Sequence, residues 1–305
     1  NTEKRSFIVA DTPGHEQYTR NMAVGASFAD LAILLVDATQ GLLTQTKRHL
    51  RISYMMGIRH FILAINKMDL ASYSEKTYKT ITDAFYTLLG SYEGAKSTVI
   101  PVSATEGDNV KHQSTNMSWY DGPSLMEYLE TAEIQPVNEK NTFVMPVQRV
   151  SRPNHQFRGY QGNIASGVLN VGDEIISLPS QVKAKVKEIY AGFDSVQSAS
   201  KGEAITITLD QEIDTSRGDI LVKEVSLEVT QGFQAEILWM DDQPLIEGRN
   251  YILKLATQSV PATLMKIKHK IDVNTGDLLP AKKLKKNEIA VCEIKAIQDI
   301  VFSSF

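Results

Sequence analysis

The chain has 305 residues, of which 42% are hydrophobic and 22% are charged, and its formal net charge is −4 at pH 7. This length exceeds the size at which one hydrophobic core keeps growing, so we expect two or three domains. The weakly acidic balance argues against a protein that coats nucleic acid. The single cysteine, Cys292, excludes an intrachain disulfide and fits a cytoplasmic protein, and no apolar run reaches the ~18 residues of a membrane-spanning helix.

The N-terminal part of the chain alternates apolar runs with helical patterns. Near-continuous apolar runs are typical of strands that are buried on both faces of a parallel sheet, and they occupy residues 7–10, 29–36, 60–65 and 97–102. Helical patterns occupy residues 15–26, 44–56, 74–90 and 123–132. This order predicts a doubly wound α/β domain of the kind that carries a phosphate loop.

From about residue 140 the pattern changes to short alternating segments that are broken by Gly, Asn, Asp and Pro. Such segments predict antiparallel strands that form β-barrels, with no long helix after residue 145. We therefore expect an α/β domain at 1–138, a β-barrel domain at 139–228 and a second, truncated β-barrel domain at 229–305.

The sequence Asp11-Thr12-Pro13-Gly14-His15 directly follows the first apolar run. A carboxylate at the carboxyl end of a strand lies where α/β sheets bind ligands, and there it can hold Mg²⁺, usually through water. Gly14 lets the backbone approach a phosphate and donate its N–H, and His15 is suited to positioning a water for attack on phosphorus. The alternative is an ordinary Pro-Gly turn with a histidine beside it.

A second motif, Asn66-Lys67-Met68-Asp69, follows the third apolar run. Asp69 can accept hydrogen bonds from N1–H and the exocyclic amine of guanine together, a pairing that adenine does not match. Asn66 can tie neighbouring loops together, and the aliphatic stem of Lys67 can cover the plane of the base. The alternative is a polar turn between a strand and a helix, where Asn and Asp are common.

The dipeptide Ser103-Ala104 follows the fourth apolar run, and its small side chains leave room for a backbone N–H to reach O6 of guanine. Alone it carries almost no information. The three motifs nevertheless occur in a fixed order, since Asp11 precedes Asn66 by 55 residues (66 − 11) and Asn66 precedes Ser103 by 37 (103 − 66), and each motif follows an apolar run. Their combination predicts a domain that binds GTP with Mg²⁺.

Longer stretches around these motifs resemble the translation-factor GTPases. The similarity covers residues 10–37 (ADTPGHEQYTRNMAVGASFADLAILLVD) and the sequence AINKMDL. Within this family, residues 152–167 (RPNHQFRGYQGNIASG) and 212–221 (EIDTSRGDIL) are similar to the GTPase subunits of bacterial sulfate adenylyltransferases.

The resemblance implies a role for each matched residue. Asp11 would serve Mg²⁺, Gly14 the γ-phosphate and His15 the attacking water, which makes His15 the expected catalytic residue. The nucleotide-binding set that the motifs define is Asp11, Thr12, Pro13, Gly14, His15, Asn66, Lys67, Met68, Asp69, Ser103 and Ala104.

The resemblance also implies a division of labour between two subunits in a heterodimer. A small catalytic subunit would make adenylyl sulfate and pyrophosphate from ATP and sulfate, and GTP hydrolysis in the larger subunit would drive that step. No nucleic acid or membrane partner is expected. One alternative is a translation-factor GTPase that delivers aminoacyl-tRNA or acts in termination, and another is a fusion with a kinase that acts on adenylyl sulfate.

The family's phosphate loop, Gly-x-x-x-x-Gly-Lys-Ser/Thr, does not occur in the 305 residues. In the family this loop and a switch segment with a magnesium-binding Thr precede the position that matches Asn1. We therefore expect the chain to be a piece of a longer protein, and we assign the expected GTPase activity to that protein.

Overall fold

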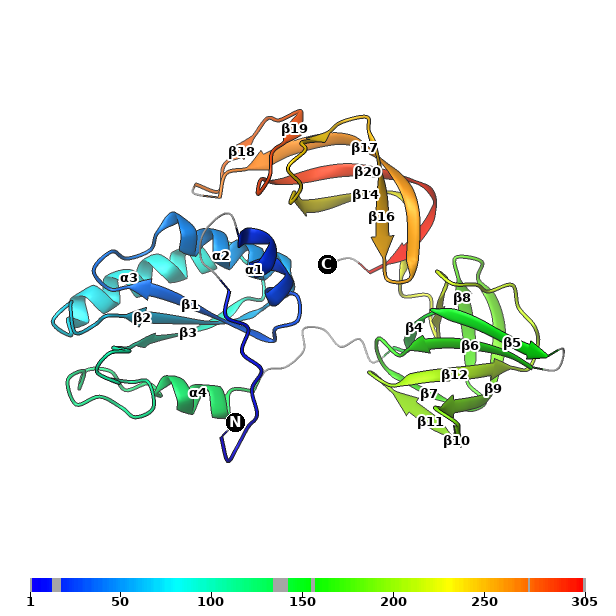
Figure 1. The fold of residues 1–305 in the computed structure, drawn as a ribbon, viewed down its shortest axis with the longest axis horizontal. Helices are drawn as coiled ribbons and strands as arrows, with labels where there is room; N and C mark the ends of the chain where they lie inside the picture. The colour runs from blue at the N-terminus through cyan, green and yellow to red at the C-terminus, as the bar shows by residue number, and fades with distance from the viewer. Residues whose placement is uncertain (1, 13–17, 134–141, 155–156, 274, 304–305) are drawn as a thin grey trace. The chain divides into compact units, whose positions relative to one another are not determined.

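The computed structural model describes residues 2–12, 18–133, 142–154, 157–273 and 275–303. Three of its strands, β1 (Leu31–Asp37), β2 (His60–Asn66) and β3 (Lys96–Pro101), form a parallel sheet in the order β1-β2-β3 (Figure 1). On the central strand, Phe61 packs into one hydrophobic cluster and Ile62 into another, on opposite faces of the sheet. The strand is buried on both faces, as its continuous apolar run predicts.

The described helices of this part are α1 (Thr19–Ala26), α2 (Thr44–Met55), α3 (Glu75–Leu89) and α4 (Leu125–Thr131). Leu50 of α2 and Phe85 of α3 share a hydrophobic cluster with Phe61, whereas Leu125 of α4 packs with Ile62 on the other face. Figure 1 shows α2 and α3 on one side of the sheet and α4 on the other. Helices thus cover both faces, which confirms the predicted α/β class.

Two of these helices begin or end as their sequences predict. At the start of α3, the Ser74 hydroxyl accepts a hydrogen bond from the Thr77 amide at 3.2 Å and so satisfies one of the helix's unpaired N–H groups. Immediately after α2, Gly57 has a φ of +101°, a conformation that only glycine adopts without strain.

The first apolar run is an exception, because Phe7–Ala10 do not form a strand. Ile8 and Val9 are 103% and 84% exposed. A strand needs a neighbour to pair with, and no described segment pairs with these residues or with the outer edge of β1. On β1, Leu35 is accordingly 68% exposed, and the prediction of a buried strand at residues 7–10 is wrong.

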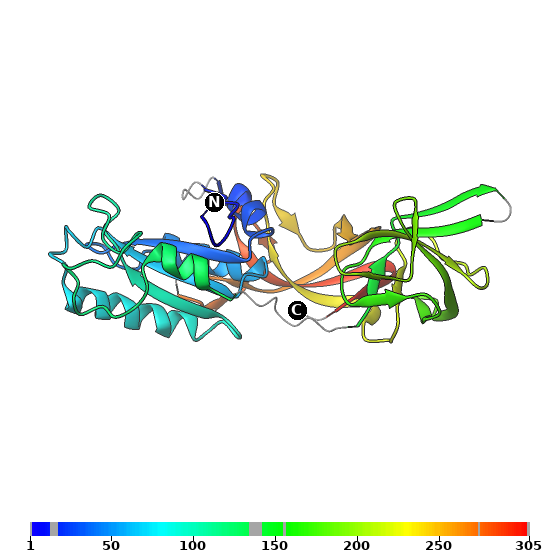
Figure 2. The same ribbon diagram turned by 90° about the horizontal axis from the view of Figure 1, so that it is seen from below.

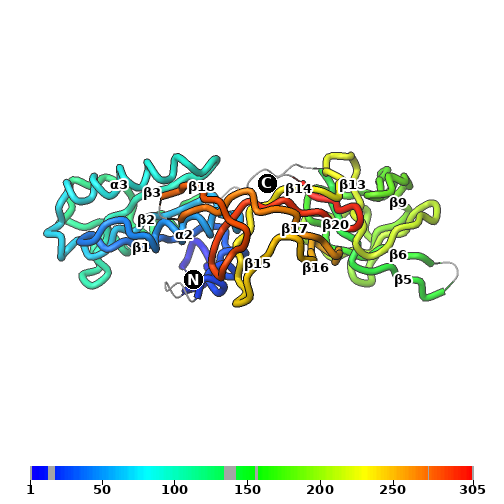
Figure 3. The backbone as a smooth tube through the Cα atoms, turned by 90° about the horizontal axis from the view of Figure 1, so that it is seen from above, coloured from blue at the N-terminus to red at the C-terminus, as the bar shows by residue number. Residues whose placement is uncertain are grey.

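From residue 142 onward, the described elements are strands. The first group is β4 (Val144–Pro146), β5 (Arg149–Asn154), β6 (Phe157–Asn163), β7 (Val168–Asn170), β8 (Glu174–Leu178), β9 (Val182–Ala191), β10 (Asp194–Val196), β11 (Ser198–Ser200), β12 (Ala204–Leu209) and β13 (Ile220–Val222). Its main sheet has the order β4-β13-β8-β9-β12-β6-β5, with β10 paired to β9, and β7 pairs with β11. In Figures 2 and 3 the hairpin of β5 and β6 extends beyond the rest of this sheet.

Strand β9 contains a bulge that shifts the alternation of buried and exposed residues along the strand. Ala184 and Val186 are buried and lie two residues apart, but the next fully buried residue is Ile189. The pairing with β12 shifts between Thr208 and Leu209, so Lys187 is an extra residue on β9. Such a bulge changes which residues face inward without breaking the strand.

A second group of strands comprises β14 (Glu228–Leu238), β15 (Leu245–Ile246), β16 (Asn250–Leu255), β17 (Gln258–Ile271), β18 (Leu278–Leu279), β19 (Lys283–Leu284) and β20 (Ile289–Phe302). The order in the larger sheet is β14-β20-β17-β16, with β18 paired to β17, and β15 pairs with β19. The prediction of strands without a long helix after residue 145 is therefore confirmed for the residues that the structure describes, and the closure of these sheets into β-barrels stays a prediction.

The chain divides into two compact units. The first comprises Asn1–Val137 with Glu236–Leu245 and His269–Ala290, and the second comprises Asn138–Ala235, Ile246–Lys268 and Val291–Phe305. The domain limits at 138 and 228 stay a prediction. None of the helices in the described part of the chain combines the length and the apolar character that a membrane crossing requires.

Candidate functional site

The carboxyl ends of β1, β2 and β3 meet at one edge of the parallel sheet. Ala38, just after β1, donates its amide to the Asn66 carbonyl at 2.8 Å. After β3, the Val102 amide bonds the Ile65 carbonyl at 2.8 Å, and the Met68 amide bonds the Val102 carbonyl at 3.2 Å. These bonds join the loop after β2 to both neighbours, so two of the predicted motifs lie together where α/β sheets bind ligands.

Asn66 links the two motif loops through its side chain. Its Oδ1 accepts the amide of Lys67 at 2.8 Å and the amide of Ala104 at 3.0 Å. The Ser103 amide bonds the Asp108 carbonyl at 3.1 Å. Both amides of the dipeptide are thus engaged within the protein, and its support of guanine O6 stays a prediction.

Ser103 connects the same two loops by a second route. Its hydroxyl, which is fully buried, donates to Oδ1 of Asp69 at 2.6 Å and accepts the Glu106 amide at 3.3 Å. One oxygen of the Asp69 carboxylate is therefore held in place. Met68 belongs to the predicted set, but its side chain is fully buried in the hydrophobic cluster that contains Phe61, so it supports the loop from within the core.

Lys67 makes a contact that the sequence does not reveal. Its Nζ lies 2.8 Å from Oδ2 of Asp37, the last residue of β1. The other oxygen of Asp37 accepts the amide and the hydroxyl of Thr39 at 2.8 and 2.7 Å. The hydrogen bond from Lys67, followed by those from Thr39, lowers the pKa of Asp37 to about 2, so the carboxylate is charged at neutral pH.

Asp37 and Thr39 are candidate functional residues that the sequence motifs do not include. The signal was present, since Asp37 is a carboxylate at the end of an apolar run, as Asp11 is. Its register partner in the sheet is Asn66, which places it beside the Asn66–Asp69 motif.

A hydrogen-bonded network supports the loop that follows Ser103. Asp108 accepts the hydroxyl of Ser114 at 2.6 Å and the side-chain amide of Asn116 at 3.3 Å. Burial raises the pKa of Asp108, but hydrogen bonds from Ser114, Tyr73 and Asn116 outweigh it and lower the pKa overall. The bond from Tyr73 connects this loop to the segment after Asp69.

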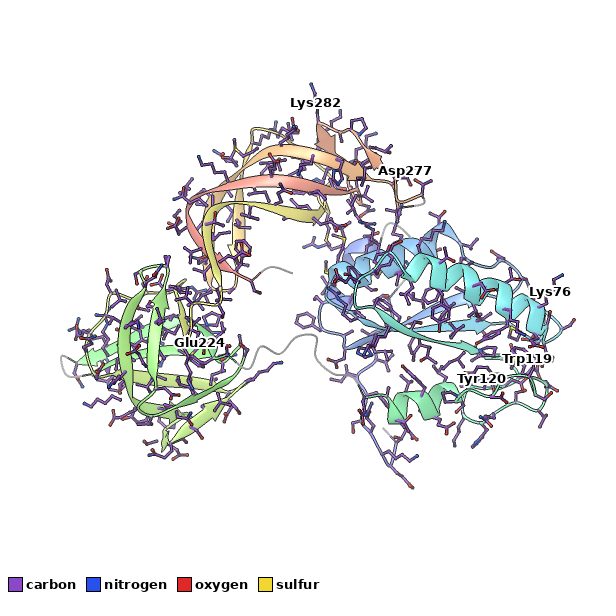
Figure 4. All side chains as sticks on the ribbon, turned by 180° about the vertical axis from the view of Figure 1, so that it is seen from behind. Lys76, Trp119, Tyr120, Glu224, Asp277 and Lys282 are labelled. Carbon is purple, nitrogen blue, oxygen red and sulfur yellow. The ribbon has the colours of Figure 1, made fainter. Side chains whose placement is uncertain are left out.

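Trp119 connects the same loops to α3. Its indole N–H donates to the Tyr73 carbonyl at 3.0 Å, and its ring centroid lies 5.1 Å from that of Tyr78. Trp119 and Tyr120 lie beside each other in Figure 4, with ring centroids 6.4 Å apart. The aromatic cluster thus stiffens the loops that carry Asp69 and Ser103.

The Asp11 motif is only partly described. Asp11 is exposed, and the methyl group of Thr12 lies 3.0 Å from where a Cβ on Gly25 would be, so α1 packs closely on this segment. Pro13, Gly14 and His15 lie outside the described residues. No group of three or more His, Cys, Asp or Glu that could hold a metal occurs among the described residues, but a single carboxylate fits Mg²⁺, which keeps waters and phosphate oxygens as its other ligands.

The family is established by comparison with known proteins. Residues 1–178 match the model described as the elongation factor Tu GTP binding domain, and residues 232–305 match the GTP-eEF1A C-terminal domain-like model. The chain belongs to the elongation factor Tu GTP-binding family, which confirms the resemblance to translation-factor GTPases.

Individual relatives within this family show which of its members the chain is similar to. The chain is 45% identical over 305 residues to "Sulfate adenylyltransferase subunit 1" of Saccharophagus degradans, covering 100% of this chain and 65% of that protein. It is 46% identical over 302 residues to "Bifunctional enzyme CysN/CysC" of Xylella fastidiosa, covering 99% of this chain and 48% of that protein. The chain thus spans between about half and two thirds of the length of these curated relatives.

A solved structure supports the fold. The crystal structure of sup35 complexed with GDP matches 91% of this chain and 72% of that chain, with a TM-score of 0.50 and 25% sequence identity.

Proposed function

We propose that the protein containing this chain is the GTPase subunit of a sulfate adenylyltransferase. The observation that carries the proposal is the 45% identity to the subunit 1 of S. degradans along the whole chain. GTP hydrolysis in this subunit would drive the formation of adenylyl sulfate and pyrophosphate from ATP and sulfate. That chemistry would take place on a smaller catalytic subunit in a heterodimer.

The guanine site of this proposal lies at the loops after β2 and β3. The Ser103 hydroxyl fixes Oδ1 of Asp69 at 2.6 Å, and a fixed carboxylate suits the two adjacent donors of guanine. A base with an acceptor at either place would leave the carboxylate facing a lone pair, so the site would reject it. Asn66 holds the two loops together, and the stem of Lys67 would cover the ring.

The phosphate end of this proposal rests on the matched motif. Asp11 would hold Mg²⁺ together with phosphate oxygens, and Gly14 would donate its amide to the γ-phosphate. His15 would position the attacking water, which in phosphoryl transfer is a large part of what a protein contributes.

The substitution Asp69→Asn tests the guanine site in the complete protein. It replaces one acceptor oxygen by an amide donor that faces a donor of guanine, so GTP binding should weaken. Xanthosine triphosphate, which has an oxygen in place of the amine, should bind better than to the parent protein. Competition binding with the two nucleotides measures this change.

A matched control is Asp242→Asn, because the Asp242 carboxylate also accepts a side-chain hydrogen bond, from Lys286 at 2.7 Å, but lies outside the motif loops. It should leave both affinities unchanged. Parent-like binding of GTP by the Asp69→Asn protein would refute the assignment of this loop.

The partner is tested separately. The complete protein, purified with and without a smaller subunit, is assayed for adenylyl sulfate formation from ATP and sulfate. Activity should require the smaller subunit, and full turnover by the protein alone would contradict the proposal.

The alternative function, a translation factor that delivers aminoacyl-tRNA or acts in termination, has the same fold. The 45% identity to S. degradans subunit 1 favours the sulfate adenylyltransferase, because the similarity to sup35 is only 25%. Purification with bound tRNA in place of a smaller subunit would favour the translation factor.

A further inference from the structure

The ammonium group of Lys67 is anchored by a residue outside the Asn66–Asp69 motif. Asp37 ends β1 and is the register partner of Asn66, so the sheet itself brings its carboxylate next to Lys67. The distance from Lys67 Nζ to Asp37 Oδ2 is 2.8 Å.

The anchor is itself fixed. Oδ1 of Asp37 accepts two hydrogen bonds from Thr39, one from the amide and one from the hydroxyl. These bonds leave Oδ2 to face Lys67. The carboxylate is therefore oriented by its own strand and turn, independently of the loop that carries Lys67.

Lys67 needs such an anchor if its stem is to act as a surface. Its side chain is 50% exposed, and a lysine side chain that is free in solvent loses rotamer entropy when it is held in one conformation. A group that is held before the ligand arrives does not lose this entropy on binding, which strengthens binding. The backbone of Lys67 has a φ of +64°, and the next residue, Met68, is buried.

We propose that Asp37 is a positioning residue for Lys67, holding its ammonium group so that the methylene stem lies ready to cover a guanine ring whose donors bind Asp69. The inference rests on the proposed guanine site and adds to it a residue from β1. Asp37 acts through Lys67 and need not touch the nucleotide.

The test is a double-mutant cycle in the complete protein, with Asp37→Asn, Lys67→Met and the double variant. Asn at position 37 keeps the side-chain size but has no charge and only one acceptor oxygen, so it cannot pair with Lys67 as an ion and accept from Thr39 at the same time. Met at position 67 keeps an apolar stem and removes the charge. The probe is GDP that carries a fluorescent methylanthraniloyl group, and its dissociation rate is measured.

Asp37→Asn should increase the dissociation rate by about twofold to fivefold, the range expected for losing an exposed ion pair. In a protein that already carries Lys67→Met, Asp37→Asn should have no further effect. Asp37→Glu alone, which keeps the carboxylate, should have a dissociation rate close to that of the parent protein. A purely structural role would instead give an effect that is equal in both backgrounds, and that outcome overturns the inference.

Two further variants separate the possible failures. Glu174→Gln removes an ion pair of similar length, 3.0 Å to Lys183, far along the chain, and should leave the rate unchanged. Asp69→Asn reports on the guanine site itself. If Asp69→Asn changes the base preference but Asp37→Asn does not change the dissociation rate, only the positioning role of Asp37 is refuted. If Asp69→Asn has no effect on nucleotide binding, the proposed guanine site itself is refuted.

Discussion

At the scale of single residues, Ser103 joins the loops after β2 and β3 by one hydroxyl group. The side chain is fully buried, donates to Asp69 and accepts from the Glu106 amide. Buried hydroxyls that both donate and accept leave two groups unsatisfied when they are removed. Ser103 therefore couples the stability of the loop to the orientation of the Asp69 carboxylate.

Ser103→Ala should lower the free energy of unfolding by about 1–3 kcal/mol and weaken guanine nucleotide binding at the same time. Thermal unfolding and nucleotide titration of the complete protein measure the two effects. Ser200→Ala is the control, because Ser200 is exposed in a different sheet and makes a similar hydroxyl bond to Glu203 at 2.9 Å. If Ser103→Ala behaved like Ser200→Ala in the nucleotide titration, Ser103 would have no part in the site.

At the scale of elements, strand β6 illustrates how closely the β-rich sheet is packed. Gly162 pairs with Ile205 of β12, and a Cβ on it would meet the carbonyl oxygen of Pro146 and the side chain of Met145. Since the obstacle includes backbone, the sheet cannot easily adjust.

Gly162→Ala should therefore lower the free energy of unfolding by about 1–3 kcal/mol through overpacking. Gly232→Ala in β14 is its matched control, since a Cβ there meets nothing within 4 Å. Denaturant unfolding of both variants gives the comparison. Equal stability of the two proteins would show that β6 tolerates the extra methyl group.

Most elements of the first unit are predictable from the sequence because their signals are local. The run at 60–65 becomes β2 (His60–Asn66), and the pattern at 74–90 becomes α3 (Glu75–Leu89). The run at 7–10 is also apolar, but it has no strand partner among the described residues, and the composition of a segment does not show whether it has one.

The candidate site likewise contains residues that the sequence identifies and one residue that only the structure identifies. Asn66, Asp69 and Ser103 are recognisable because each follows a strand in a fixed order. Asp37 reaches Lys67 across 30 residues of sequence, through the register of β1 and β2. Only the structure establishes that register, so the sequence could not identify the pair.

At the scale of the whole molecule, the proposal couples GTP hydrolysis to chemistry on another subunit. His15→Ala in the complete protein with its partner should leave GTP affinity near normal, because binding would depend on the base and the other phosphate contacts. GTP hydrolysis should fall by on the order of 10²-fold, the loss typical of a positioned catalytic group.

Adenylyl sulfate formation should lose its stimulation by GTP in parallel with hydrolysis. Both rates are measured in the same preparation by product analysis. Unchanged hydrolysis in the intact complex would return His15 to a structural role.

The unpaired edge of β1 affects the tendency of the 305-residue chain to associate with itself in solution. Leu35 and Ile33 are 68% and 42% exposed on a strand whose outer edge has no partner among the described residues, and such edges recruit strands from other molecules. We expect the isolated chain to form oligomers at high concentration, and Leu35→Lys to suppress them, as light scattering would show. Phe193→Lys removes a side chain that is 104% exposed in a turn, and it should leave the scattering unchanged. Equal effects of the two substitutions would mean that general surface hydrophobicity, and not the strand edge, governs the colloidal behaviour of the chain.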